Sequence, residues 1–111
     1  MKKIFAAGIL ALSSAVMGAS IDHLQQAVDH EFRSDANKAR DAHRHPVETL
    51  AFFGVKSGQT IVELWPGRGW YTEILTTAVG PKGKIIAAGF DPESSIDYFK
   101  KNAAVFAKHL E

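Results

Sequence analysis

Apolar residues near the start of the chain follow a helical period. Residues at steps of three and four, separated by charged or amide residues, predict an amphipathic helix of about three turns; they are Ile21, Leu24, Val28 and Phe32. From residue 33 to residue 44 this stripe gives way to charged residues. The pattern therefore predicts a helix followed by a charged stretch without an apolar stripe.

A second helix is predicted to begin at Pro46, because proline favours the first helical position. Glu48 falls in its first turn, where a negative charge suits the helix dipole. We expect Leu50, Phe52 and Phe53 to form its buried side. Gly54 is a suitable stop, so the helix is expected to end there.

The period changes after the turn at 57–59. Residues 60–65 (TIVELW) read as a short buried strand, and the breaker Pro66-Gly67-Arg68-Gly69 ends it. A helical pattern over 71–79 then ends at Gly80-Pro81, and residues 84–90 predict a second buried strand. A last helix is expected to start at 91–94, with Ile96, Phe99, Ala103, Phe106 and Leu110 on one face.

This order of elements predicts an α/β fold, the N-terminal portion of a Rossmann-like parallel sheet (β-α-β-α) preceded by two or three helices. Two strands do not complete such a sheet and leave a hydrophobic edge open. Either the sequence is a truncated domain or another copy supplies strands, and we favour truncation. We divide the chain into 1–19 and 20–111, the latter into a helical lead-in (20–56) and a nucleotide-binding unit (57–111).

The first 19 residues have the order of a secretory signal peptide. Two lysines precede an unbroken apolar run from residue 4 to residue 12, and small residues follow up to Ala19. The run is short for a membrane span, although an uncleaved N-terminal anchor is the alternative. We therefore expect export to the periplasm or beyond, with no membrane contact apart from this segment.

Composition excludes several classes of function. A formal charge of +1 gives no basic footprint for nucleic acid. The absence of cysteine excludes disulfides, thiolate metal sites and a cysteine nucleophile. The candidate chemistry must come from other side chains and from the backbone.

The glycine-rich turn after the first predicted strand is the best candidate for a binding site. Glycines at 67 and 69 let a ligand approach the backbone, and the next helix offers free N–H groups for an anionic group. A tight turn without a ligand is the alternative, because two glycines are a weak signal. Asp91 follows Gly69 by 22 residues, as a dinucleotide site would require, but Thr72 stands where that motif wants a third small residue.

Residues 61–69 (IVELWPGRG) resemble motif I of the class I S-adenosylmethionine-dependent methyltransferases, and residues 79–86 (VGPKGKII) resemble the connection that follows it. The segments 40–46, 65–67 and 70–72 resemble a group of exported bacterial methyltransferase-like proteins. The resemblance covers about 34–110, the N-terminal portion of such a domain. It specifies no substrate.

The resemblance implies S-adenosylmethionine as cofactor and gives roles to matching residues. Gly67 and Gly69 would pass close to its methionine portion, and Glu63 would hold its ammonium group. Asp91, two residues beyond the usual position, would bind the ribose or else cap the following helix. Trp65 replaces a small residue of the loop, so it would narrow the pocket or stack on the ligand.

The charged stretch supplies the remaining candidates. Arg44 and His45, with Arg40 and His43, form a cluster that would bind an anionic substrate or lie over the cofactor; a solvated turn is the alternative. We expect no metal site, because a third ligand at useful spacing is missing.

The predicted function is methyl transfer from S-adenosylmethionine to an unknown acceptor. The alternatives are a non-catalytic module that binds a small molecule or a partner, and a fragment of an NAD(P)-dependent oxidoreductase. The general base and the acceptor site are not identified, and we expect the chain to be inactive by itself.

Overall fold

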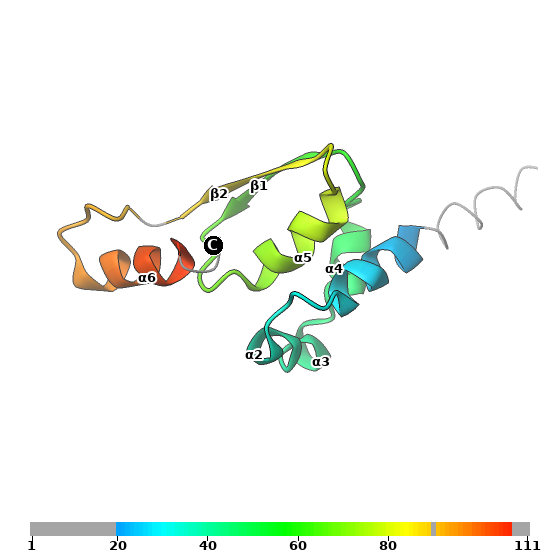
Figure 1. Cartoon of the computed structure of the whole chain (residues 1–111), viewed down its shortest axis with the longest axis horizontal. Helices are drawn as coiled ribbons and strands as arrows, with labels where there is room; N and C mark the ends of the chain where they lie inside the picture. Colours follow the sequence, from blue (N-terminus) through cyan, green and yellow to red (C-terminus); the bar gives the residue numbers. More distant parts are fainter. Residues whose placement is uncertain (1–19, 90, 108–111) are drawn as a thin grey trace, which may run out of the picture.

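The computed structural model describes residues 20–89 and 91–107 (Figure 1). Residues 20–29 form a helix, followed by α2 (Asp35–Lys38), α3 (Asp41–Arg44) and α4 (Pro46–Phe52). The strand β1 (Thr60–Leu64), the helix α5 (Trp70–Val79), the strand β2 (Lys84–Ala88) and the helix α6 (Asp97–Ala107) complete the order. The predicted signal segment and Leu110 lie outside the described residues.

The two strands form a parallel sheet joined through α5. Thr60 pairs with Lys84 and Leu64 with Ala88, so the two strands run in step over their whole length. The predicted α/β class and the β-α-β-α order are confirmed in this coarse form. The sheet is too small to distinguish a Rossmann-like domain from other parallel arrangements.

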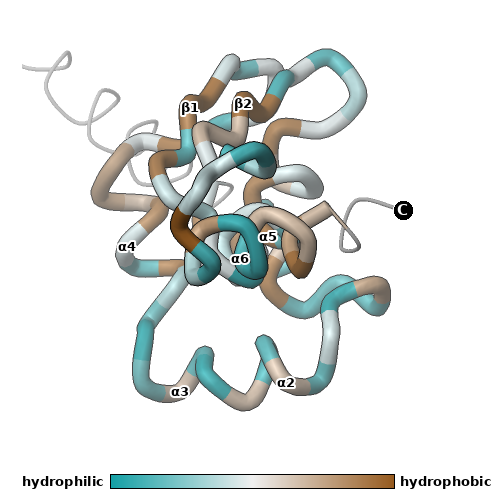
Figure 2. The backbone as a smooth tube through the Cα atoms, turned by 90° about the vertical axis from the view of Figure 1, so that its left-hand side faces the viewer, coloured by the Kyte–Doolittle hydropathy of each residue, from teal (hydrophilic) through white to brown (hydrophobic). Residues whose placement is uncertain are grey.

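The hydrophobic core lies between the helix at 20–29, α4 and α5, on one face of the sheet. Its best-buried members include Leu24, Ala27, Leu50, Trp70 and Ile74. Ile61 and Ile85 pack against this cluster from the two strands. Figure 2 shows hydrophobic positions on the strands and largely hydrophilic chain around α2 and α3.

The turn after α4 forms as the sequence predicts. Gly54 has a φ of 70°, a left-handed conformation that glycine adopts without steric cost. The Val55 N–H donates to the Leu50 carbonyl and the Gly54 N–H to the Ala51 carbonyl, which is the Schellman arrangement of a helix end. Gly80 likewise ends α5, as predicted.

Four aromatic and aliphatic residues that we assigned to buried faces are exposed instead. Phe32 is about half exposed, because the first helix ends at residue 29 and Phe32 falls in the turn beyond it. Ile21, near the start of that helix, is also about half exposed. Phe52 and Phe53 point away from the core, because α4 buries Pro46 and Leu50, one turn apart. The expectation of buried side chains at these positions was wrong.

Two further expectations are corrected. The strand β1 is buried on one face only, since α5 covers Ile61 and Glu63 while Val62 and Leu64 remain exposed. Helix α6 begins at Asp97 and not at 91–94, because Asp91 caps a turn of its own. Within the described residues α6 buries none of its side chains fully.

Candidate functional site

The glycine-rich turn joins the carboxyl end of β1 to the first turn of α5. Gly67 has a φ of 60° and Gly69 a φ of 78°, both in the left-handed region that favours glycine. The Gly69 N–H donates to the Pro66 carbonyl at 2.9 Å, and the Gly69 carbonyl accepts from the Glu73 N–H at 3.0 Å. Gly69 is therefore both the end of a tight turn and the cap of α5.

Gly67 faces open space. A Cβ atom at position 67 would meet nothing within 4 Å. No neighbouring atom therefore requires a glycine there, and the missing side chain leaves room beside the backbone. Trp65 also has a positive φ, 53°, which is strained for a bulky residue. Its side chain is 73% exposed. Strain at an exposed aromatic beside a glycine turn is typical of functional loops.

Glu63 is a buried carboxylate placed against the start of α5. Strand alternation turns it toward the helix, and its Oε2 accepts a hydrogen bond from the Thr72 hydroxyl at 2.6 Å. Burial raises the pKa of Glu63, while the hydroxyl and backbone hydrogen bonds from Thr72 act in the opposite direction. Thr72, which departs from the dinucleotide motif, thus holds the Glu63 carboxylate in place.

A small hollow lies at the glycine turn. It has a volume of about 220 Å³ and is lined by the turn, by the end of β2 and by α6; the lining residues are Pro66, Gly67, Ala87, Gly89, Pro92, Ala103, Phe106 and Ala107. Ligand pockets usually occupy about 300–1,000 Å³. Helix α6 therefore covers the position where a ligand of the glycine turn would lie.

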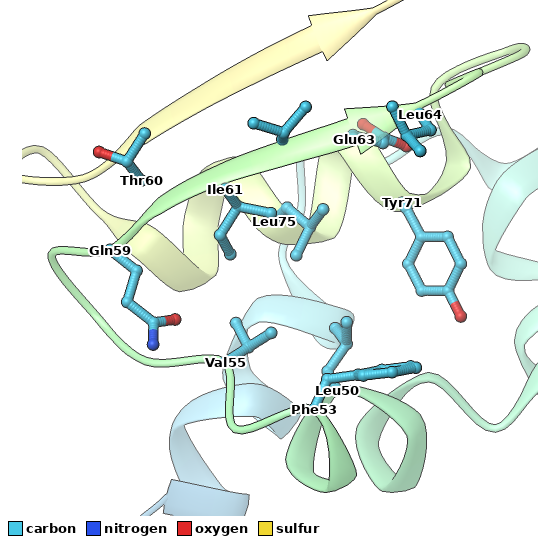
Figure 3. A pocket seen from close by; sticks show the side chains of 11 residues that line it. Leu50, Phe53, Val55, Gln59, Thr60, Ile61, Glu63, Leu64, Tyr71 and Leu75 are labelled. Atoms are coloured by element: carbon cyan, nitrogen blue, oxygen red, sulfur yellow. The ribbon is translucent and has the colours of Figure 1, made fainter.

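A larger pocket of about 740 Å³ lies on the other side of Glu63, along the outer edge of β1 (Figure 3). Apolar side chains of α4, α5 and the strand line most of it, Leu50, Phe53, Ile61 and Leu75 among them. Glu63 is the only carboxylate among the lining residues that the structure describes. The buried carboxylate thus borders both the start of α5 and an apolar pocket.

The other predicted ligand contact, Asp91, is exposed in the turn after β2. Its Oδ1 accepts a hydrogen bond from the Glu93 N–H at 2.9 Å, and its carbonyl accepts from the Ser94 N–H at 3.2 Å. Asp91 does not line the hollow at the glycine turn. In this arrangement its carboxylate orders a turn ahead of α6.

Arg44 and His45 are both exposed. The Arg44 guanidinium carbon lies 4.7 Å from the centre of the Trp70 ring, a cation–π contact at the start of α5. His45 joins α3 to α4 with a φ of 46°, and its carbonyl accepts from the Thr49 hydroxyl at 2.9 Å. Arg44 is thus brought to the same helix end as the glycine turn, whereas the backbone of His45 shapes a corner.

A buried polar cluster, which we call the Arg33 cluster (Arg33, Asn37, Asp41, Trp70 and Glu73), was missed from the sequence. Arg33 donates to both carboxylate oxygens of Asp41, at 2.7 and 3.0 Å, and to the Val28 carbonyl at 2.6 Å. Its Nε lies 3.7 Å from a Glu73 oxygen. The Trp70 indole N–H points to Asp41 Oδ1 and to the Asn37 carbonyl, each at 3.0 Å.

This cluster fixes the stretch 33–41 against the first turns of α5 through Arg33, Asn37 and Asp41. Arg40, His43, Arg44 and His45 are exposed, as the solvated-turn alternative expects. The sequence signal that could have revealed the Arg33 cluster is weak. It consists of an arginine eight residues before an aspartate, a spacing that matches neither the helical nor the strand period. The side chains that contact the Arg33–Asp41 pair from α5, Trp70 and Glu73, lie some thirty to forty residues later in the sequence.

No group of three or more histidine, aspartate or glutamate side chains in the described part of the chain is arranged to hold a metal ion. None of the described helices is both long and apolar enough to cross a membrane. Comparison of the chain with protein-family models, with curated proteins and with solved structures gives no match. The assignment of a function therefore depends on the side chains at the glycine turn.

Proposed function

We propose that the chain forms the S-adenosylmethionine-binding part of a methyltransferase. The observation that carries this proposal is the Glu63 carboxylate, buried at the start of α5 beside the glycine turn and bonded to Thr72. A carboxylate in this position is suited to an ammonium group. The cofactor carries one on its methionine portion.

The same carboxylate argues against the dinucleotide alternative. A dinucleotide places its pyrophosphate at the start of the helix that follows the glycine turn, where free N–H groups and the helix dipole attract anions. Here Thr72 of that first turn already holds the Glu63 carboxylate. A phosphate group at this point would face a second acid, and like charges at close range repel.

The remaining residues would contribute as follows. Gly67 and Gly69 would let the methionine portion approach the backbone, and Trp65 would stack on the ligand or narrow its entrance. When bound, the cofactor would supply the methyl group: an electron pair of the acceptor would form the new bond to the methyl carbon as the carbon–sulfur bond breaks, with S-adenosylhomocysteine as the leaving group and the acceptor's proton passing to a base or to water. Positioning is most of what the protein supplies.

The position of α6 sets a condition on this function. The hollow of about 220 Å³ is smaller than ordinary ligand pockets, so the cofactor has to displace Ala103, Phe106 and Ala107 from the glycine turn. Helix α6 buries no side chain fully, and a segment with so little buried apolar surface opens at low cost.

Two glycine substitutions test the site. Gly67→Val is expected to abolish binding of S-adenosylhomocysteine, measured by titration calorimetry, because the valine side chain enters the space beside the turn. Gly58→Val is the matched control: Gly58 also has a positive φ, 81°, with nothing within 4 Å of its Cβ position. Both variants carry similar backbone strain, and only Gly58→Val should retain binding. Equal affinity in the two variants would overturn the assignment.

The non-catalytic binding module is the second candidate. Its supporting observation is the pocket of about 740 Å³ at the edge of β1, which is far larger than the hollow at the glycine turn. A chain that binds neither S-adenosylhomocysteine nor NAD would favour this alternative.

A further inference from the structure

The start of α5 lacks the usual side-chain cap. The first N–H groups of a helix have no partner within the helix, and a side chain at the N-cap position normally accepts from one of them. Gly69 holds that position here and makes no side-chain hydrogen bond. The Glu63 carboxylate of the preceding strand performs this role, because it accepts from the backbone N–H and from the hydroxyl of Thr72, the third residue of α5.

The bond between the Thr72 hydroxyl and the carboxylate is short and buried. Thr72 Oγ1 lies 2.6 Å from Glu63 Oε2, and the two residues are only 7% and 9% exposed. This length is typical of a hydroxyl that donates to an ionised carboxylate. Such a bond favours the charged form of the acceptor, whereas burial favours the neutral form. The Thr72 hydroxyl therefore acts on the charge of Glu63 as well as on its position.

No charged side chain performs this task in its place. β2 sets an alanine beside Glu63, and the lysine of β2 lies at the other end of the ladder. Apolar side chains of α4 and the turn after it line the pocket that Glu63 borders, and α5 adds the phenol of Tyr71. Glu73 lies 3.7 Å from the Arg33 guanidinium, and Arg68 of the glycine turn is exposed. Among the described residues, the pKa of Glu63 is therefore shifted by burial and by its hydrogen bonds, without a neighbouring charge.

We propose that Thr72 determines the specificity of the site: its hydroxyl keeps Glu63 an anion, so that the site selects a nucleoside ligand that carries an ammonium group. A buried carboxyl group without this bond would take up a proton more readily and offer an ammonium group no charge. The inference rests on the proposed function, because the ammonium group is that of the cofactor's methionine portion. Thr72 is thus a positioning residue that acts through Glu63.

Calorimetric titration of Thr72→Val with S-adenosylhomocysteine over a range of pH tests the inference. Valine keeps the shape of threonine and removes the hydroxyl, so the pKa of Glu63 should rise further and a proton should oppose binding up to a higher pH. A hydrogen bond to a charged group corresponds to about tenfold or more in an equilibrium constant. Below the pH midpoints of both proteins, the variant should bind about tenfold more weakly or worse. Well above both midpoints the two affinities should converge.

Two variants and a second ligand complete the experiment. Thr72→Ser keeps the hydroxyl and should restore the parent's pH profile. Thr76→Val is the matched control: it makes the same change one turn later on α5, where the hydroxyl donates to the Thr72 carbonyl at 2.7 Å and not to Glu63. Methylthioadenosine, a nucleoside without the ammonium group, should bind the parent and Thr72→Val alike. Thr72→Ala also removes the hydroxyl and serves if the valine variant does not fold.

The outcomes separate this inference from the proposed function. Parent and Thr72→Val with the same pH profile would overturn the role of Thr72 and leave the cofactor site intact. A loss of affinity that is equal at every pH would do the same, because it would show a structural role alone. A parent chain that binds no S-adenosylhomocysteine at any pH would overturn the proposed function, and the specificity with it.

Discussion

Substitution of Asp41 by leucine provides a demanding test of the Arg33 cluster. The Asp41 carboxylate receives two hydrogen bonds from Arg33 and one from the Trp70 indole. The Arg33 side chain has no exposed surface, and that of Asp41 is 19% exposed. Asp41→Leu therefore leaves a buried guanidinium without its bidentate partner, while the indole keeps its bond to the Asn37 carbonyl.

The expected loss is large for a chain of this size. Removing one member of a buried ion pair typically costs about 3–5 kcal/mol of unfolding free energy. At roughly 0.05–0.15 kcal/mol per residue, a chain of 111 residues is stable by only about 6–17 kcal/mol. We therefore expect Asp41→Leu to remove about a fifth or more of the stability, and to lower the urea midpoint accordingly.

Urea unfolding followed by tryptophan fluorescence is the appropriate assay, because Trp70 is buried in the cluster and changes its environment on unfolding. Replacing both partners, in Arg33→Met with Asp41→Leu, should cost less than the sum of the single changes, by about 1–3 kcal/mol. Asp29→Ala is the control: Asp29 is exposed and accepts one bond, from Gln25. A loss below about 1 kcal/mol for Asp41→Leu, as for surface pairs, would refute the reasoning.

Three further predictions concern the glycine turn and its neighbours. Burial raises the pKa of Glu63 above 4.5, so the folded state binds the carboxyl proton more tightly than the unfolded state does. The free energy of unfolding that this proton contributes is lost as the pH rises through the raised pKa of the folded state. Glu63→Gln should therefore gain stability relative to the parent as the pH rises above the ordinary glutamate value of 4.5, measured by urea titrations; a pH-independent difference would contradict this. Trp65→Gly relieves a left-handed conformation that costs a bulky residue about 1–2 kcal/mol, so thermal melting should show no loss of stability, yet ligand affinity should fall. Phe106→Ala enlarges the hollow under α6 and should tighten S-adenosylhomocysteine binding in calorimetry, whereas Val105→Ala, which does not line the hollow, should have no effect.

Strong local signals explain the parts of the fold that the sequence predicts correctly. Pro46 fixes its own φ at a helical value, and Gly54 and Gly80 adopt positive φ angles that end a helix, so the start of α4 and the ends of α4 and α5 can be predicted without tertiary information. The strands follow from runs of β-branched residues bounded by turns, and their parallel pairing follows from the helix between them. The position of Glu63 and the glycine turn at the end of β1 is a consequence of that order.

The features that were missed depend on contacts between distant parts of the chain. A charged stretch is normally solvated, and Arg33 is buried only because Asp41 and Glu73 come to it from two other elements. Helix α6 carries an apolar stripe without a core to receive it, so its start and its position over the glycine turn could not be derived from the pattern alone. Phe52 and Phe53 are apolar in sequence, but the α4 positions facing the core are taken by Pro46 and Leu50.

Titration calorimetry of the chain with S-adenosylhomocysteine, and in parallel with NAD, tests the central proposal most directly. The Glu63 carboxylate at the start of α5 predicts heat of binding with S-adenosylhomocysteine, its loss in Gly67→Val, and none with NAD. Binding of NAD without S-adenosylhomocysteine would contradict the account, because a pyrophosphate would then share the helix start with a buried acid. Binding of neither would leave the glycine turn as a structural turn, and the cofactor proposal would be wrong.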